Sequence, residues 1–95
     1  MPKASHAREV RKFTDIPNVG KAMERDFRAM GFTTPRNLAA QDPFELYTRT
    51  CAISGVRQDP CVLDTYLAVC DFMDGGDPLP WWNFTASRKA RWPNL

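Results

Sequence analysis

Apolar residues recur along this chain at the spacing of α-helices, and no stretch shows the alternation expected of a β-strand. Within residues 20–30 they stand at Met23, Phe27 and Met30, which share one face of a helix. Gly31, directly after this stripe, is a typical helix-ending residue. The pattern therefore predicts an all-α protein.

Two longer helices are predicted over residues 43–54 and 60–73, because each begins at an Asp-Pro pair. Asp42 and Asp59 are suited to be N-cap residues, and the prolines that follow them suit the first helical position. Gly55 is expected to end the first of these two helices.

Shorter helical segments complete a set of about five helices. One begins near Ala7 and carries Val10 and Phe13 on one side, and another covers residues 35–40. An aromatic C-terminal extension follows, in which Thr85 is expected to cap a short final helix.

Two tight turns, at residues 15–20 and 54–59, separate pairs of these helices, and residues 34–41 connect the pairs. This order predicts a doubled helix-hairpin-helix bundle, although the halves are too different in sequence to establish a repeat. We expect residues 1–6 to form a flexible N-terminal tail and residues 7–95 to form one domain, since 95 residues suffice for a single core.

At the first turn, residues 16–22 resemble the helix-hairpin-helix signature, in which an apolar residue and a proline precede Gly-apolar-Gly. Ile16 and Val19 are expected to anchor the turn between its helices. Gly20 has no side chain, so a phosphate oxygen can approach the backbone where the next helix begins. The unpaired N–H groups and the positive end of the helix dipole face that oxygen, and Lys21 adds a full charge.

Asn18 takes the place of the first glycine of that signature. Asparagine tolerates the left-handed backbone conformation better than most residues, so the turn is expected to survive the exchange. Its side chain is expected either to crowd the phosphate or to contact it. The alternative is a hairpin that only packs two helices together. The predicted nucleic-acid contacts are Asn18, Val19, Gly20, Lys21 and Arg25.

Charge is unevenly distributed, although the net charge is only +2. Residues 1–40 contain eight basic residues (Lys or Arg) and four acidic residues, whereas residues 41–80 contain two basic and seven acidic residues. Residues 81–95 contain three basic residues and no acid. Two basic ends around an acidic middle permit an electropositive face, and the alternative is an ordinary solvated helix surface.

Neither a secretion signal nor a membrane-crossing apolar run is visible, so a cytoplasmic location with no membrane partner is expected. Three cysteines are a poor disulfide framework, and no close pair marks a metal site. Cys61, in the first turn of a helix, is either a thiol activated by the helix N-terminus or, as we favour, a buried structural residue.

The second turn is expected to have a structural role. Arg57 and Gln58 are placed to approach a second phosphate, but Asp59 at the next helix start repels an anion. In the C-terminal extension, Trp81 and Trp82 are expected to close over the core, since a small protein needs that burial. The alternative is stacking on single-stranded bases. Basic residues that are expected to extend a phosphate-binding face are Arg88, Lys89 and Arg91.

Unusual segments, above all Arg-Gln-Asp-Pro-Cys at residues 57–61 and Pro-Trp-Trp at residues 80–82, support a wider resemblance. From residue 13 to residue 92 the sequence resembles a family of small bacterial proteins, the pathogenicity-locus family, some of whose members are labelled mitomycin-resistance proteins. The resemblance implies the doubled helix-hairpin-helix fold and DNA binding. The drug-resistance label fits a protein that acts near damaged DNA.

No catalytic triad, phosphate loop or dinucleotide motif is visible, so we expect a protein that is not an enzyme and uses no cofactor or metal. The sequence favours a DNA-binding module that holds backbone phosphate without reading base sequence, in DNA repair or damage tolerance. One hairpin binds weakly, so a protein partner or a homodimer is expected to raise the affinity. The alternative is a protein-interaction adaptor that uses the same fold without nucleic acid.

Overall fold

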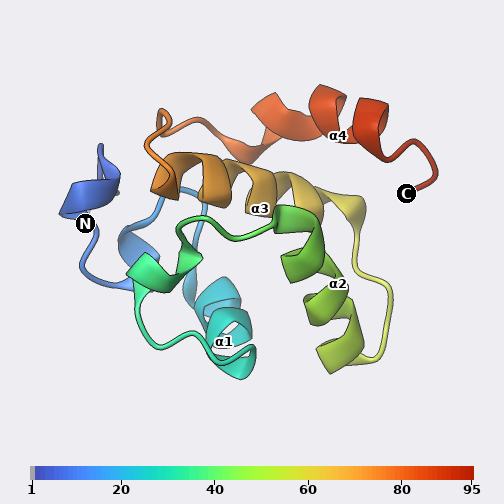
Figure 1. The fold of residues 1–95 in the computed structure, drawn as a ribbon, viewed down its shortest axis with the longest axis horizontal. Helices are drawn as coiled ribbons and strands as arrows, with labels where there is room; N and C mark the ends of the chain where they lie inside the picture. Colours follow the sequence, from blue (N-terminus) through green and yellow to red (C-terminus); the bar gives the residue numbers. More distant parts are fainter. Residues whose placement is uncertain (1) are drawn as a thin grey trace.

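The longest helix, α3 (Pro60–Met73), runs through the middle of the molecule in the computed structural model, which describes residues 2–95 (Figure 1). Every side chain from Leu63 to Cys70 is buried, so this part of the helix has no face in water. Leucine, alanine, valine and cysteine make up most of this stretch, and its buried polar side chains Asp64, Thr65 and Tyr66 each form a hydrogen bond, which suits a helix that is covered on all sides.

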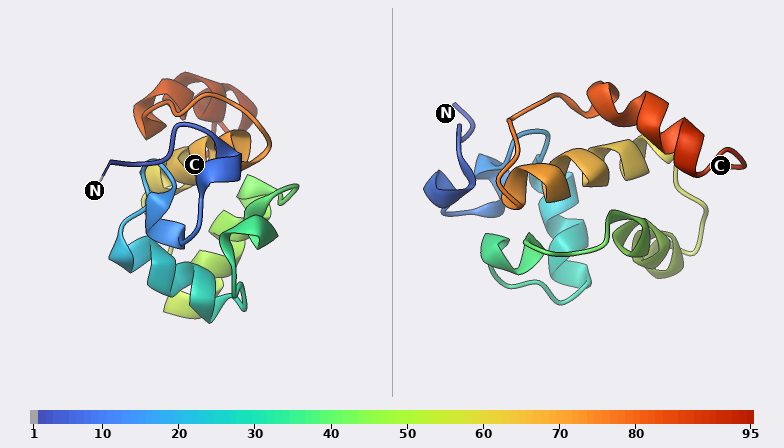
Figure 2. Two further views of the ribbon diagram at one scale, coloured as in Figure 1. Left: turned by 90° about the vertical axis from the view of Figure 1, so that its left-hand side faces the viewer. Right: turned by 45° about the horizontal axis from the view of Figure 1, so that its top comes forward.

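Three further α-helices surround α3. Helix α4 lies on one side of α3, whereas α1 and α2 lie on the opposite side, and both views of Figure 2 keep this arrangement. These helices are α1 (Lys21–Ala29), α2 (Pro43–Ser54) and α4 (Thr85–Arg91). The 3₁₀ segments are η1 (Ala7–Glu9), η2 (Phe13–Asp15), η3 (Pro35–Leu38) and η4 (Trp81–Phe84). Residues 2–95 contain no strand, which confirms the all-α class, and four α-helices where about five were predicted.

The starts of α2 and α3 confirm the predicted caps. The Asp42 carboxylate accepts a hydrogen bond from the Phe44 backbone N–H at 2.9 Å, and the Asp59 carboxylate accepts one from the Cys61 backbone N–H at 2.8 Å. Gly55 ends α2 in the left-handed conformation, with φ 76°, as predicted. These elements are specified locally, by residues within a few positions of each helix end.

The predicted helix from Ala7 is wrong, because two separate 3₁₀ turns, η1 and η2, take its place. The Glu9 carboxylate accepts hydrogen bonds from the backbone N–H groups four and three residues before it, at 3.0 and 3.1 Å. The Asp15 carboxylate makes the same pair of bonds at 3.0 and 3.1 Å. Each acidic side chain therefore closes its own turn and competes with a continuous helix.

The predicted helix over residues 35–40 is also a 3₁₀ segment, η3. Here the Asn37 side-chain oxygen accepts hydrogen bonds from the backbone N–H groups four and three residues before it, at 3.3 and 3.2 Å. Ala40 follows with φ 62°, a left-handed conformation that ends any helix. The same local device thus shapes η1, η2 and η3.

An aromatic cluster centred on Phe27 joins the N-terminal turns to the central helix. The Phe27 ring lies 5.6 Å from that of Phe13, 5.7 Å from that of Tyr66 and 6.3 Å from that of Phe32, measured between centroids. The Tyr66 hydroxyl is hydrogen-bonded to Thr50 Oγ1 at 2.7 Å, so its polar atom is satisfied within the core. This packing fixes α1 and η2 against α3.

A buried ion pair fastens α4 to α3. Asp64 is fully buried, and its carboxylate accepts hydrogen bonds from Arg88 Nε and Thr85 Oγ1, each at 2.8 Å. This hydrogen bonding raises the pKa of Arg88 above its usual value. Thr85 is the first residue of α4 rather than its cap, and Arg88 is buried, so two predictions about these residues are wrong.

Residues 1–6 were predicted to be a flexible tail, and Met1 lies outside the described residues. The Ala4 backbone N–H donates to the Asp15 carbonyl oxygen at 2.8 Å, which places the described part of this segment beside η2. The flexibility of the tail stays a prediction. None of the helices in residues 2–95 combines the length and apolarity that crossing a bilayer requires.

Candidate nucleic-acid interface

The turn between η2 and α1 is anchored as predicted. Ile16 and Val19 are fully buried, and the Val19 backbone N–H donates to the Ile16 carbonyl oxygen at 3.1 Å. Asn18 between them has φ 73°, so it adopts the left-handed conformation expected of the glycine that it replaces. The two apolar anchors turn the backbone of Gly20 outward, where it is exposed.

The N-terminus of α1 differs from those of α2 and α3 because no side chain caps it. Gly20 is the N-cap residue, and the first backbone hydrogen bond of the helix runs from the Glu24 N–H to the Gly20 carbonyl oxygen at 3.0 Å. Within residues 2–95, the backbone N–H groups of residues 21–23 have no backbone acceptor. They are the donors that a helix presents at its positive end.

The packing around position 20 leaves room for a side chain, so it does not require a glycine there. A Cβ atom built on Gly20 would meet no atom within 4 Å, and the residue has a negative φ of −107°. The backbone is therefore approachable from solvent over a wide angle. Lys21 is exposed beside it, so the charge and the open backbone occupy the same end of α1.

The side chain of Asn18 neither points to this open backbone nor blocks it. Asn18 Nδ2 donates to the Leu79 carbonyl oxygen at 2.9 Å, and Asn18 Oδ1 accepts from the Trp81 backbone N–H at 3.2 Å. Both polar atoms of the amide are thus engaged with the C-terminal segment. Sequence reasoning considered only a phosphate as their partner, because a contact with residues 79–81 leaves no local signal.

Lys3 is a charged neighbour of this turn that sequence reasoning missed. Its ammonium group donates hydrogen bonds to the carbonyl oxygens of Thr14 and Val19, so it lies directly against the turn. A lysine in a polar N-terminal segment gives no hint of such a contact. The structure therefore adds Lys3 to the cations near the N-terminus of α1.

The predicted residues Lys21 and Arg25 are both exposed on α1. They are four residues apart, so they lie on the same side of the helix. Arg28 is engaged elsewhere, in an ion pair with Glu24 at 3.2 Å and over the Phe13 ring at 5.2 Å from its centroid. In residues 2–95 neither Lys21 nor Arg25 takes part in an ion pair.

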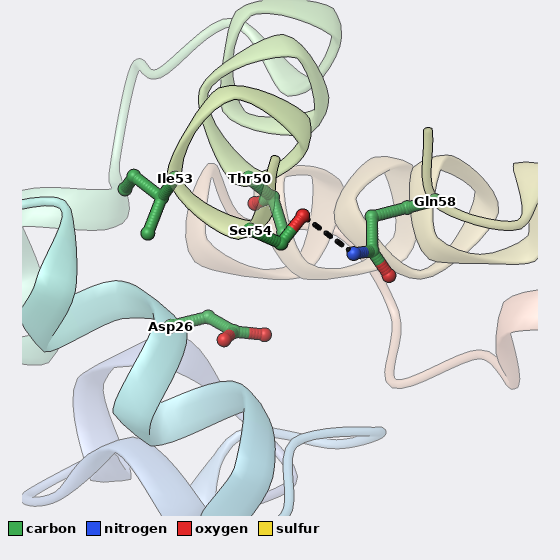
Figure 3. Close-up of a pocket in the computed structure, with 5 residues that line it drawn as sticks. All are labelled: Asp26, Thr50, Ile53, Ser54 and Gln58. Atoms are coloured by element: carbon green, nitrogen blue, oxygen red, sulfur yellow. Dashed lines mark hydrogen bonds between the residues drawn. The ribbon is translucent and has the colours of Figure 1, made fainter. Parts of the chain in front are cut away.

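The second turn is built differently at the start of its helix. The Asp59 carboxylate occupies the N-terminus of α3, and the hydrogen bond from the Cys61 backbone N–H lowers its pKa. A second anion at this position is repelled, which agrees with the predicted structural role. Nearby, Gln58 Nε2 donates to Ser54 Oγ at 2.8 Å beside a small cavity that Asp26 also lines (Figure 3).

Trp81 and Trp82 were both predicted to close over the core, but only Trp81 is partly covered. Trp81 is half-buried, whereas 62% of Trp82 is exposed, and their rings meet edge to face with centroids 5.7 Å apart. Trp92 provides the burial instead, stacked on Phe44 at 5.1 Å. The prediction is wrong for Trp82 because apolar residues further along the chain, including Leu95, cover the helices.

The cysteines show no sign of an activated thiol. Cys61 is half-buried, so the prediction that it is buried is wrong, and burial together with Asp59 raises the pKa of its thiol. Burial raises the pKa of Cys70 to about 12. No cluster of three metal-ligating side chains occurs in the part of the chain that the structure describes.

These features define an all-α protein whose open helix N-terminus lies within its basic first forty residues. The chain belongs to the pathogenicity locus family (Cdd1), whose family model matches residues 6–90. It is 42% identical over 76 residues to a protein from Streptomyces lavendulae named mitomycin resistance protein McrB, covering 80% of this chain and 72% of that relative. No solved structure gives a significant match. The resemblance noted from the sequence is confirmed.

Proposed function

We propose that this protein binds the phosphate backbone of DNA at the N-terminus of α1 without reading base sequence. The observation that supports this most is the uncapped first turn of α1, which follows an exposed glycine whereas α2 and α3 are capped by aspartates. Free N–H groups and the positive end of a helix dipole bind phosphate oxygens. Contacts of this kind position a protein on DNA but do not distinguish sequences.

The fold is interpreted here as a doubled helix-hairpin-helix. Each of the two interhelical turns contains one left-handed residue, Asn18 with φ 73° and Gly55 with φ 76°, shortly before a helix begins. The turns differ in the residue at the helix start, Gly20 in the first and Asp59 in the second. In this interpretation the first half binds phosphate and the second half supports the fold.

Three cations support the phosphate role of the first half. Lys21 and Arg25 project from the same side of α1, and Lys3 lies against the turn. Several positive charges around the amide donors strengthen the attraction for a phosphate chain and make it sensitive to salt. Because the proposed contact is electrostatic and uses backbone donors, it requires no cofactor, no metal and no enzymatic step.

The relative from Streptomyces lavendulae is named for mitomycin resistance, and this name agrees with a role near damaged DNA. A protein that holds the backbone without reading sequence is suited to lesions, which occur in any sequence. The affinity of one hairpin is low, so we further propose that a protein partner or a second copy adds a second contact.

Fluorescence anisotropy with a labelled DNA duplex at two salt concentrations tests the proposal. Lys21→Glu is expected to weaken binding about tenfold at low salt, because it reverses a charge beside the phosphate. Arg57→Glu makes the same charge change at the second turn and is expected to leave the affinity nearly unchanged. Absence of binding at low salt, or an equal loss in both variants, would contradict the phosphate site.

The alternative function is protein binding through the second turn. Ile53 in the last turn of α2 and Val56 just after the helix are 56% and 61% exposed, which is high for large apolar side chains. Sedimentation of the protein over a range of concentrations, with and without Val56→Asp, tests for self-association at this place. A monomer at all concentrations that still binds DNA would favour the phosphate proposal over this one.

A further inference from the structure

We propose that the surface formed by Leu79, Trp81 and Trp82, called here the stacking surface, receives an unpaired nucleobase next to the phosphate bound at α1. The preferred ligand is then a duplex with a single-stranded flank, rather than uniform duplex. This inference rests on the proposed function, because it names the substrate class of the same site. It is carried by the position, the exposure and the surroundings of these residues.

The position of the stacking surface is set by the turn itself. The Asn18 side chain bonds to the Leu79 carbonyl oxygen at 2.9 Å and to the Trp81 backbone N–H at 3.2 Å. Asn18 is only two residues before Gly20, where the open N-terminus of α1 begins. The aromatic segment is therefore held beside the turn that leads into the phosphate site, because hydrogen bonds from the Asn18 side chain join the two.

The exposure of Trp82 is not explained by the packing of the fold. Trp82 is 62% exposed and Leu79 is 38% exposed. The Trp81 ring meets the Trp82 ring edge to face at 5.7 Å, which restrains the exposed indole. A restrained, exposed indole offers a flat face on which a base of any identity stacks.

A shallow, open cavity of about 370 Å³ adjoins the stacking surface, between the N-terminal segment and residues 78–80. Pro17, Leu79 and Pro80 contribute apolar walls, and Lys3 contributes a positive charge. The Lys3 ammonium group uses two of its three donors on carbonyl oxygens, which leaves the third for a ligand. Apolar walls beside a cation suit a nucleotide, which combines an apolar base face with a phosphate.

The charges favour a nucleic acid over an apolar protein partner. An apolar partner seated on Trp82 and Leu79 would bring Lys3, which lines the same cavity as Leu79, out of water without a counter-charge, and such burial is unfavourable. A single strand brings one phosphate per nucleotide to the same place. The stacking surface and the α1 N-terminus then form one continuous interface for a strand that leaves a duplex.

The test compares three DNA ligands with the wild-type protein by anisotropy: a blunt duplex, the same duplex with a six-nucleotide single-stranded flank, and the duplex with an abasic flank of equal length. The two flanks carry equal charge and differ only in their bases. We expect the flank with bases to bind about tenfold tighter than the abasic flank. Indole fluorescence is expected to fall only with the flank that carries bases.

Variants of Trp82 test whether this residue causes the difference in affinity between the two flanks. Trp82→Ala is expected to remove the difference between the flanks and to leave blunt-duplex affinity within about twofold, whereas Trp82→Phe retains part of the difference. Trp92→Phe, which alters the tryptophan that stacks on Phe44 rather than one of the stacking surface, is expected to change neither affinity.

Each unfavourable outcome has a separate meaning. Equal binding of the two flanks by the wild-type protein overturns the stacking surface and leaves the phosphate site intact. A Trp82→Ala variant that weakens the blunt duplex as much as the flanked one also overturns it. Loss of all duplex binding, or duplex binding that Lys21→Glu does not change, contradicts the proposed function itself.

Discussion

Asn18 and Leu79, which are 61 residues apart in the chain, are joined by a hydrogen bond of 2.9 Å from the asparagine amide to the leucine carbonyl oxygen. Asparagine tolerates the left-handed backbone better than most other non-glycine residues and also carries two hydrogen-bonding groups. Position 18 needs both properties, because the turn requires φ 73° and the C-terminal segment requires a partner. A glycine would satisfy only the first of these needs.

Two substitutions at Asn18 separate its two roles. Asn18→Gly keeps the left-handed turn and loses two partly exposed hydrogen bonds, so unfolding free energy is expected to fall by about 1 kcal/mol. Asn18→Ala also forces an alanine into the left-handed conformation, which adds roughly 1 kcal/mol. Urea unfolding measures both changes. An alanine variant as stable as the glycine variant would contradict the cost assigned to the left-handed backbone. Unchanged hydrogen exchange at the Trp81 amide in Asn18→Gly would contradict the role of the Asn18 side chain in holding residues 79–81.

The buried pair of Asp64 and Arg88 is expected to be the most sensitive site for stability. Asp64→Asn or Arg88→Met leaves one partner buried without its counter-charge, and each is expected to cost about 3–5 kcal/mol. The double variant Asp64→Leu with Arg88→Met removes both charges and is expected to cost less than either single change. Thermal and urea unfolding check this order. A double variant as unstable as the sum of the single ones would show that the two side chains do not act as a pair.

Stability is expected to decrease in acid because of the carboxylates that close local turns. Backbone N–H donors lower the pKa of Glu9 below its usual 4.5 and the pKa of Asp15 below its usual 3.8. The unfolded chain therefore binds these protons first as the pH falls. The stabilisation is complete above about pH 5 and is lost progressively as the pH falls through 4.5 and 3.8 toward the lower folded values.

Urea unfolding between pH 6 and pH 3 measures this loss. Asp15→Asn is expected to reduce the dependence on pH, whereas Asp77→Asn makes the same charge change at an exposed position outside these turns and is expected to alter it little. An identical pH profile for the wild type and Asp15→Asn would be inconsistent with the role given to the Asp15 carboxylate.

The thiols are expected to react slowly. Burial and the neighbouring Asp59 raise the pKa of Cys61, so alkylation by iodoacetamide at pH 8 is expected to be slower than in a short cysteine peptide. Asp59→Asn is expected to accelerate it. Cys70, whose pKa is raised to about 12 by burial, is expected to react only after unfolding. Peptide mapping by mass spectrometry resolves each site. A Cys61 that outpaces the free peptide would restore the hypothesis of an activated thiol.

Features that depend on neighbouring residues could be predicted from the sequence. The Asp42 and Asp59 caps and the left-handed Asn18 each follow from the preferences of a residue in its local setting. Among local features, the first segment, residues 35–40 and the cap expected at Thr85 are exceptions. Glu9 and Asp15 capture backbone N–H groups so effectively that two short turns replace the helix that periodicity predicted.

Features that depend on contacts across the chain could not be predicted. No residue close to Asp64 in the sequence signals its burial, yet the fold buries it and gives it Arg88, which lies 24 residues further along. The Lys3 contact with Val19 and the Asn18 contact with Leu79 are of the same kind. Trp82 was expected over the core because a small protein needs burial, but composition alone does not say which of several aromatic residues the core accommodates.

The long separation between Asn18 and Leu79 also orders the events of folding. The turn around Asn18 is held by bonds between residues three or four apart, which close quickly, whereas its bond to residue 79 requires a loop of about sixty residues to close. We expect the open N-terminus of α1 to form first and the aromatic segment to dock onto it last. In a chain emerging from the ribosome, the local hydrogen bonds of the turn are then expected to close before Trp82 has been synthesised.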